Sequence, residues 1–424
     1  MQLRPYQARA VAAVRAALPD HRSVLLVSPT GSGKTTMGAA LAQAAALDGE
    51  TPLWVAHRTE LIDQAAAALG AAVGPGVARV ASIQTLHARG ERPPADLLIL
   101  DEAHHCAAET FRGLTAAYPN ARILGLTATP ARGDGRALDT FEHMIVAARP
   151  RELETAGYLV PMEIVRPAKP LKPGQIAQRP VDAWRQHAMG RSTIVFCASV
   201  EHAEREAASF SAEAHAFGAA VIEASTPPKE RRDLLDDYRI DYAPRVLCNV
   251  AVLTEGTDLP NTSCIILTRG CGHAGLYMQM TGRGSRPHPG KTDCIIIDLR
   301  GVSHVHGHPY DDREYSLEGI GIRRPSAPAN QSYCRVCGAP IEAGAGCDEC
   351  GIEAASAKPI TVTNTPLVKY AAARRQGADR RAANLRRWKL EAATAGHRIG
   401  RAYVRYQAVY GERVPPDVER LSRE

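Results

Sequence analysis

Residues 28–35, Ser-Pro-Thr-Gly-Ser-Gly-Lys-Thr, bring glycines, a lysine and hydroxyl side chains together at the spacing of a phosphate-binding loop. An apolar run at 24–27 precedes the loop and predicts a buried strand, and an Ala-rich run at 36–46 predicts a helix. In this context the backbone N–H groups of the turn and the helix N-terminus bind phosphate oxygens. Ser28 stands where the usual pattern has its first glycine. An ordinary glycine turn before a helix is the competing interpretation.

The side chains of this loop suit a nucleotide bound together with a magnesium ion. Lys34 has the length to reach the β- and γ-phosphates, and the Thr35 hydroxyl is a ligand for Mg²⁺. We therefore predict ATP as the cofactor, held by Thr30, Gly31, Ser32, Gly33, Lys34, Thr35 and Thr36.

A pair of carboxylates follows the apolar run at 97–100. Asp101 and Glu102 come directly after this predicted strand, and ligands in open α/β sheets bind at that end of a strand. Asp101 is placed to hold Mg²⁺ through water, and Glu102 is placed to orient the attacking water. The alternative is an acidic pair that caps the next helix.

Strand and helix patterns alternate in two blocks, which is typical of doubly wound parallel sheets in α/β proteins. The first block has predicted strands at 24–27, 53–56, 97–100 and 123–126 and helices at 36–46 and 61–69. The second has predicted strands at 193–197, 219–222, 245–248, 264–267 and 294–297 and helices at 200–210 and 229–238. Residues 149–180 are rich in proline and predict an inter-domain connection. We expect domains at 1–155 and 156–325.

The second block lacks a phosphate loop but carries Arg283 and Arg286 in a glycine-containing turn. Taken alone, two such arginines are usually solvated. Together with the loop of the first block, they suggest ATP held in a cleft, where an arginine from the second block stabilises charge on the γ-phosphoryl group.

The chain resembles the superfamily 2 helicases from about Leu3 to Ile322. The matching motifs, in chain order, are LRPYQ at 3–7, SPTGSGKT at 28–35, VAHRTELIDQ at 55–64, ASIQTL at 81–86, DEAH at 101–104, LTATP at 126–130, VLTEGTDLP at 252–260 and QMTGRGSR at 279–286. TATPARGDG and QMTGRGSRP look like the restriction-subunit and excision-repair branch, whose members mostly act on DNA. The resemblance implies two RecA-like lobes.

The resemblance also implies roles for individual residues. LRPYQ would place Gln7 at the adenine and Arg4 at the nucleotide. VLTEGTDLP would place Gly256 and Asp258 at the nucleotide. QMTGRGSR adds catalytic roles for Gln279, Arg283 and Arg286. Of the two arginines, Arg286 is favoured as the arginine finger, the side chain that stabilises charge on the γ-phosphoryl group. Arg58, Thr85 and Thr257 would face the nucleic-acid backbone, where polar groups contact phosphate and sugar without reading sequence.

Four cysteines form two CxxC pairs, Cys334 with Cys337 and Cys347 with Cys350, each followed by glycine. Four thiolates at this spacing suit tetrahedral Zn²⁺, so we predict a zinc ribbon at 328–356. Such a small segment would take much of its folding energy from the metal. A redox CxxC and unrelated free thiols are the alternatives.

Residues 357–424 predict a basic helical tail. From Lys358 onward there are 15 Lys and Arg and 6 Asp and Glu, or +9, so the remainder of the +6 chain carries 6 − 9, or −3. Arg398, Arg401 and Arg405 share one face of the helix predicted from Gly396 to Tyr410, and aromatic residues lie on another. The arginine face is a candidate for phosphate contact. A solvated arm is the alternative, and core packing is the alternative for the aromatic face.

The phosphate-loop and carboxylate motifs predict ATP and Mg²⁺, and the resemblance implies a DNA helicase or translocase. An RNA helicase, and a nucleic-acid-gated ATPase that does not separate strands, remain alternatives. We expect no membrane partner, because no apolar run approaches the roughly 18 residues of a span. The start of the chain has no apolar core of a signal peptide, and the six scattered cysteines suit reduced thiols, so we expect a cytoplasmic protein.

Overall fold

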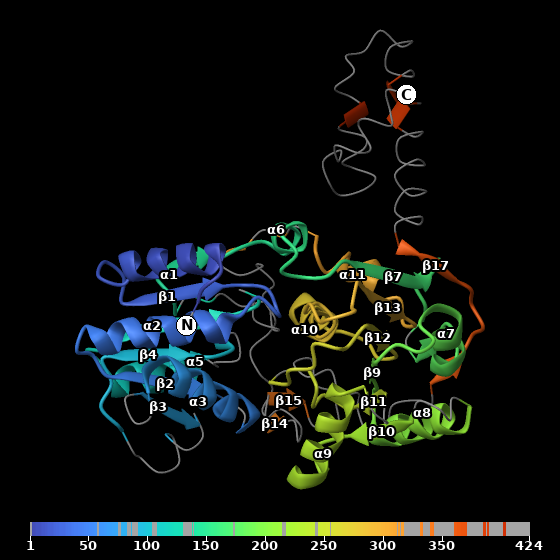
Figure 1. The fold of residues 1–424 in the computed structure, drawn as a ribbon. Coiled ribbons are helices and arrows are strands. Elements are labelled where there is room, and N and C mark those ends of the chain that lie inside the picture. Colours follow the sequence, from blue (N-terminus) through green and yellow to red (C-terminus); the bar gives the residue numbers. More distant parts are fainter. Residues whose placement is uncertain are drawn as a thin grey trace.

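The chain folds around two separate β-sheets, each covered by helices (Figure 1). The computed structural model describes residues 2–56, 59–74, 78–82, 86, 92–103, 108–129, 138, 140–172, 174–213, 218–241, 245–254, 256–311, 313, 315–317, 331–333, 340–342, 360–370, 385–386, 388–389 and 402–403. Among these residues no helix is long and apolar enough to cross a membrane.

The first sheet has six strands in the order β3-β2-β4-β5-β1-β6, and all of its pairings are parallel. The strands are β1 (Ser23–Val27), β2 (Pro52–Ala56), β3 (Arg79–Ser82), β4 (Leu97–Leu100), β5 (Arg122–Thr127) and β6 (His143–Val146). The central strands β1, β2 and β4 are buried along their whole length. This burial explains their continuous apolar sequences, because helices cover both faces of a parallel sheet.

The helices of this lobe are α1 (Pro5–Ala17), α2 (Lys34–Leu47), α3 (Thr59–Val73) and α5 (Ala108–Ala117). α1, α2 and α3 bury apolar side chains against one face of the sheet, in a core around Trp54, Met37 and Leu41. A Cβ atom at Gly38 would lie 2.6 Å from the Trp54 ring, so α2 approaches the sheet closely at this residue. Leu114 of α5 belongs to the core on the opposite face.

The second sheet has seven strands in the order β10-β11-β9-β12-β13-β7-β17. They are β7 (Met162–Pro167), β9 (Thr193–Phe196), β10 (Ala219–Ile222), β11 (Val246–Asn249), β12 (Cys264–Leu267), β13 (Cys294–Asp298) and β17 (Leu367–Lys369). All pairings are parallel except that of β17 with β7. Its helices are α7 (Pro180–His187), α8 (Val200–Glu213), α9 (Pro228–Arg239), α10 (Ala274–Gly282) and α11 (Ser303–His306). The two predicted parallel-sheet lobes are thus confirmed.

The prediction for 149–180 was wrong in part, because this stretch holds regular structure as well as a connection. It contains α6 (Pro150–Thr155), β7 and β8 (Gln175–Ile176). Pro150 and Pro180 occupy the first positions of α6 and α7, where proline costs no hydrogen bond. The prolines therefore mark the starts of elements in addition to the crossing between the sheets.

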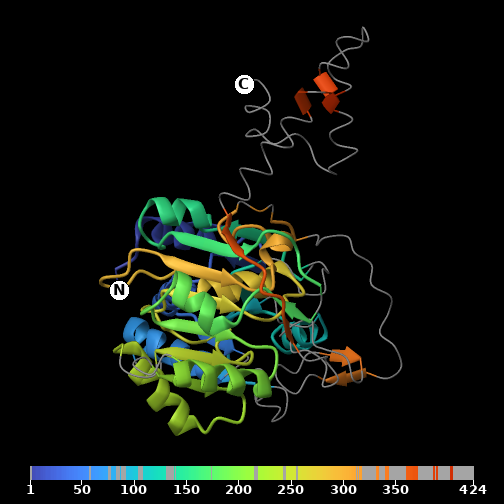
Figure 2. The same ribbon diagram turned by 90° about the vertical axis from the view of Figure 1, so that its right-hand side faces the viewer.

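The prediction of a helical tail from residue 357 was also wrong for its first residues. β16 (Thr361–Val362) pairs with β8, and β17 extends the second sheet beside β7. The later described residues 385–386, 388–389 and 402–403 are helical, and Leu385, Trp388 and Ala402 are buried. The Lys389 ammonium group lies over the Tyr403 ring, 5.1 Å from the ring centre. In Figures 1 and 2 these helical residues lie apart from both sheets.

Two further short strands flank the first cysteine pair. β14 (Gln331–Tyr333) and β15 (Pro340–Glu342) form an antiparallel hairpin in which Tyr333 pairs with Pro340. Cys334 and Cys337 belong to the connection between these strands, and all four predicted zinc ligands lie outside the described residues. The hairpin lies outside both sheets in the two views (Figures 1 and 2).

Candidate nucleotide site between the two sheets

The predicted phosphate loop connects β1 to α2 at the carboxyl end of the first sheet. Gly31 and Gly33 both have φ of +83°, a left-handed conformation that favours glycine, and Gly33 is the N-cap of α2. The Ser28 and Ser32 hydroxyl oxygens are 2.6 Å apart, and the Ser32 hydroxyl donates to the Pro29 carbonyl at 2.6 Å. Ser28 therefore braces the loop from the position where glycine is usual.

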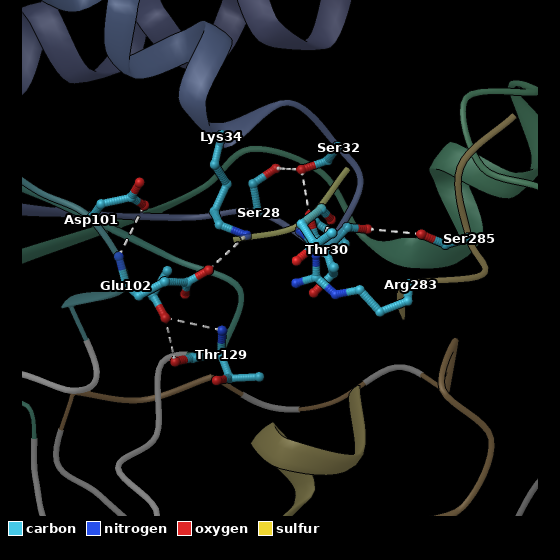
Figure 3. Close-up of polar contacts among 12 residues, drawn as sticks. Ser28, Thr30, Ser32, Lys34, Asp101, Glu102, Thr129, Arg283 and Ser285 are labelled. Carbon is cyan, nitrogen blue, oxygen red and sulfur yellow. Dashed lines mark hydrogen bonds and ion pairs between the residues drawn. The ribbon is translucent and has the colours of Figure 1, made fainter. Parts of the chain in front are cut away.

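The lysine of the loop faces the strand-end carboxylates. Lys34 Nζ lies 3.8 Å from Glu102 Oε1, and both side chains are about nine-tenths buried. Asp101 Oδ1 accepts a hydrogen bond of 3.0 Å from the Glu102 N–H. Glu102 has φ of +47°, an uncommon conformation for a residue with a side chain and one found often at functional sites. Figure 3 shows Lys34 pointing from α2 toward Glu102.

These groups also fit the predicted Mg²⁺. Thr35 lies in the first turn of α2 next to Lys34. Asp101 directly follows β4, which is separated from β1 by the single strand β5. A hydroxyl and a carboxylate are hard oxygen ligands of the kind that Mg²⁺ prefers. Thr36, the last predicted nucleotide residue of the loop, lies in the same helical turn.

The first turn of α1 is hydrogen-bonded to the phosphate loop. The Gln7 amide donates to the Ser32 carbonyl at 2.9 Å, and the Tyr6 hydroxyl donates to the same oxygen. Gln7 Oε1 accepts from the Arg4 N–H at 2.9 Å. The Arg4 guanidinium lies 4.7 Å from the centre of the Tyr158 ring. Gln7, which the resemblance assigned to the adenine, therefore lies beside the phosphate loop, and Arg4 lies beside Gln7.

The predicted arginines lie in the turn after α10. Figure 3 shows Arg283 on the other side of the phosphate loop from Lys34. Arg283 donates to the Thr257 carbonyl at 2.7 Å, and Arg286 donates to it at 3.3 Å. Arg286 also forms an ion pair of 2.9 Å with Asp258. Burial lowers the pKa of the Arg286 guanidinium, and the Asp258 carboxylate opposes that shift. A Cβ atom on Gly31 would lie 3.1 Å from Arg286 Cγ, so this side chain packs on the phosphate loop.

Direct contacts join this turn of the second sheet to the loop of the first. The Ser285 hydroxyl lies 3.2 Å from the Thr30 carbonyl and 2.7 Å from the Gly282 carbonyl. A Cβ atom at Gly282 would lie 2.5 Å from Thr30 Cβ, so only glycine permits this approach. The Ser285 carbonyl accepts from the Val160 N–H at 2.9 Å. The arginine turn of the second lobe and the phosphate loop of the first lobe therefore meet at Thr30.

A second contact between the sheets involves the end of β5. The Thr127 hydroxyl donates to the Thr129 carbonyl at 2.8 Å and accepts from the Thr129 N–H at 3.1 Å, which fixes this turn. A Cβ atom at Gly275 would lie 3.1 Å from Thr129 Oγ1. α10 thus contacts the first lobe near both of its ends.

The remaining predicted residues divide into two groups. Gln279 is buried in α10, and Gly256 has φ of +74° in the loop that carries Thr257 and Asp258. The nucleic-acid candidates Arg58, Thr85, Arg398, Arg401 and Arg405 lie outside the described residues.

Three residues that support the site were not predicted: Tyr6, Ser285 and Lys291. The Lys291 ammonium group donates to the carbonyls of Arg286 at 2.8 Å and Pro260 at 3.0 Å. Burial lowers its pKa to about 8. Ser285 and Tyr6 lie within matched motifs, but their contacts with the phosphate loop depend on the packing of distant segments.

Family models match both lobes. The model for the res subunit of type III restriction enzymes matches residues 1–79 and 77–132, and the model for the helicase conserved C-terminal domain matches residues 177–288. The chain belongs to the superfamily 2 helicases, in the restriction-subunit-like branch.

This superfamily 2 chain has relatives in yeast and in a phage. It is 31% identical over 361 residues to a protein described as a mitochondrial ATP-dependent helicase, irc3, of Schizosaccharomyces pombe, and the match covers 72% of this chain and 59% of that protein. It is 29% identical over 363 residues to a 51.5 kDa protein of a Lactococcus phage, over 74% of this chain and 77% of that one. The chain therefore spans less than two thirds of the length of irc3.

Solved structures share the fold of this superfamily 2 chain. A fragment of an HsdR subunit of a type I restriction enzyme from Vibrio vulnificus aligns over 72% of this chain and 65% of its own, with a TM-score of 0.57 and 21% identity. The DUF1998 helicase MrfA, bound to DNA and AMPPNP, aligns over 72% of this chain and 50% of its own, with a TM-score of 0.54 and 17% identity.

Proposed function

We propose that the chain hydrolyses ATP between its two lobes and couples hydrolysis to movement along DNA. One observation carries the proposal: the turn with Arg283 and Arg286 packs on the phosphate loop through Ser285 and Thr30. If hydrolysis needs groups from both lobes, its rate depends on the contact between the lobes. A ligand that favours one arrangement of the lobes therefore changes the rate of hydrolysis. A bound nucleic-acid strand is the ligand that the family assignment supports.

In this mechanism the ATP phosphates bind in the phosphate loop. Lys34 then gives up its ion pair with Glu102 and pairs with phosphate oxygens instead. Glu102 would then be free to hold the attacking water. Asp101 and Thr35 would hold Mg²⁺, which would neutralise charge at the phosphates. The arginine turn supplies positive charge that acts on the transferring group. Gln7 would hold the adenine beside the first turn of α1, and Arg4 would contact the nucleotide.

DNA is the proposed substrate because the branch and the DNA-bound fold neighbours favour it. A type ISP restriction–modification enzyme, LlaBIII, was solved bound to DNA, as was MrfA. Arg58, Thr85 and Thr257 would contact the backbone of the strand. An RNA helicase and a switching ATPase remain the other candidates, because they use the same ATPase site.

Zn²⁺ is the proposed structural metal of the cysteine-rich segment 328–356. The hairpin of β14 and β15 supports it, since paired residues close the connection that carries Cys334 and Cys337. Four thiolates form a closed structural zinc site. Residues 1–155 and 156–325 would be the two lobes, with 361–369 added to the second. The cytoplasm is the proposed location, because the five described cysteines are free and four are buried.

Replacing Lys34 with alanine tests the proposal. The wild-type protein should hydrolyse ATP slowly alone and faster with nucleic acid, while Lys34→Ala should lose both activities because the phosphates lose their cation. ATPase and strand-displacement assays, each with DNA and with RNA, separate the three candidates. Wild-type turnover in the Lys34→Ala protein would contradict the nucleotide site.

A further inference from the structure

A segment near the end of the second lobe returns to the first lobe. We call residues 308–317 the return segment. It leaves α11 and passes the connection between the sheets, where the Tyr310 hydroxyl donates to the Val160 carbonyl at 2.8 Å. It then reaches the first lobe, where the Leu317 carbonyl accepts from the Leu138 N–H at 2.8 Å.

The start of the return segment is fixed on the second lobe. His308 contacts the Met162 carbonyl of β7 through Nε2 at 3.1 Å, and its Nδ1 accepts from the Tyr310 N–H at 3.1 Å. Its N–H donates to Asp311 at 2.8 Å. Both ring nitrogens are thus used by the neutral imidazole, and burial lowers the pKa of His308, which favours that form.

The end of the return segment is fixed on the first lobe by apolar packing. Tyr315 and Leu317 pack against the core that contains Leu138, Phe141 and Leu100. Between the two ends, Arg149 donates to the Arg313 carbonyl at 3.2 Å, and Arg151 pairs with Asp311 at 3.3 Å. The chain therefore crosses between the lobes a second time, and both ends of this crossing are held.

Hydrogen bonds connect this crossing to the arginine turn. Tyr310 bonds to the Val160 carbonyl, the Val160 N–H bonds to the Ser285 carbonyl, and the Ser285 hydroxyl lies against the Thr30 carbonyl. Tyr310, Ser285 and Thr30 also line one small cavity with Gly282. A single residue, Val160, thus links the return segment to the turn that brings Arg283 and Arg286 to the phosphate loop.

We propose that Tyr310 and Leu317 are positioning residues for ATP hydrolysis, and that the return segment sets how the arginine turn docks on the phosphate loop. This inference rests on the proposed hydrolysis at the interface. Leu317 packs on the core of the first lobe, and the Tyr310 hydroxyl bonds to the Val160 carbonyl. Losing either one lets the lobes separate without removing a group that binds ATP.

The expected signature is a lower kcat with an unchanged KM for ATP, because the loop in the first lobe still binds the nucleotide. Leu317→Asp should lower nucleic-acid-stimulated kcat by about tenfold, or ~1.4 kcal/mol of transition-state stabilisation. Leu317→Met should restore wild-type kcat, since it keeps the apolar contact. Leu47→Asp is the matched control, because Leu47 is 82% exposed on the same lobe.

Small-angle scattering and Tyr310→Phe complete the test. Leu317→Asp should increase the radius of gyration of the nucleotide-free protein, and Leu47→Asp should not. Tyr310→Phe removes only the hydroxyl and should lower kcat at constant KM and melting temperature, so it decides the case if Leu317→Asp fails to fold. Wild-type kcat in a folded Leu317→Asp protein, or in Tyr310→Phe, would overturn the inference. Absence of ATPase in the wild-type protein would instead reject the proposed function.

Discussion

At the scale of single residues, the Thr257 carbonyl is the point where both candidate fingers meet. Arg283 and Arg286 donate to it, and Arg286 is also paired with Asp258. Arg286 is the better candidate for the arginine finger. The aliphatic part of its side chain packs on Gly31, and its guanidinium can exchange the Asp258 carboxylate for a phosphate oxygen. Arg283 is more deeply buried, with 4% of its surface exposed, which suits a role in holding the turn.

We predict that Arg286→Ala lowers kcat strongly, on the order of 10³-fold, with little change in KM, because a finger acts mainly on transition-state charge. Steady-state ATPase with saturating DNA measures both constants. Arg286→Lys should remain impaired, since a lysine lacks the planar fork of donors. An unchanged kcat with a raised KM would show that Arg286 binds only ground-state ATP, and Arg283 would become the finger.

The positions of the candidate catalytic residues were predictable because each lies within a few residues of a strand or helix signal. Lys34 and Glu102 follow strands of the first sheet, and parallel pairing brings the ends of those strands to one edge. Tyr310 and Lys291 were not predictable, because their partners are backbone carbonyls of residues far from them in sequence or in another turn. A carbonyl leaves no signal in the sequence.

At the scale of elements, the strands that were missed are those with the weakest patterns. β16 and β17 are only two and three residues long, and short strands show no usable periodicity. β7 lies within the proline-rich stretch, but its own proline, Pro167, is at its last position and pairs with the edge strand β17. Pro167 lies past the residues of β7 that pair with β13, so its missing N–H costs no hydrogen bond in that ladder. Its presence therefore did not exclude a strand.

The cysteine-rich segment is the element whose fold would depend most on a ligand. We predict that purified protein carries about one Zn²⁺ and that Cys337→Ser loses it, because three thiolates bind more weakly than four. Metal analysis of protein kept reduced measures this. Cys271→Ser is the control, because Cys271 is a free cysteine in the second lobe, remote in sequence from both pairs. Metal-free wild-type protein would remove the ribbon.

At the scale of the whole molecule, the chain connects its two lobes more than once. After the return segment ends at Leu317 on the first lobe, the described chain rejoins the second lobe at Ile360, which packs there ahead of the paired strands β16 and β17. The ends of residues 318–359 are therefore held on different lobes. Any change in the separation of the lobes changes the distance between these ends, whatever the segment itself binds.

The uneven charge of the molecule leads to the last prediction. The tail from Lys358 onward carries +9 and the rest −3, so attraction to DNA should come largely from the tail. Replacing Arg398, Arg401 and Arg405 by alanine should flatten the slope of log K against log salt by up to about 3 units, because each neutralised phosphate contributes roughly 0.9 units on duplex DNA. Binding should weaken almost equally across sequences, since phosphate contacts do not read bases.

A matched control separates local contact from net charge. The triple variant of Arg205, Lys229 and Arg232, which are exposed on α8 and α9, removes the same charge from the second lobe. If the tail arginines contact phosphate, DNA titrations at several salt concentrations will show a flatter slope for the tail variant than for this control. Basal ATPase should be unchanged in the tail variant, because the candidate catalytic residues all precede the return segment. Equal slopes in the tail variant and the wild type would mean that these arginines face water, and the lobes would then have to supply the DNA contacts.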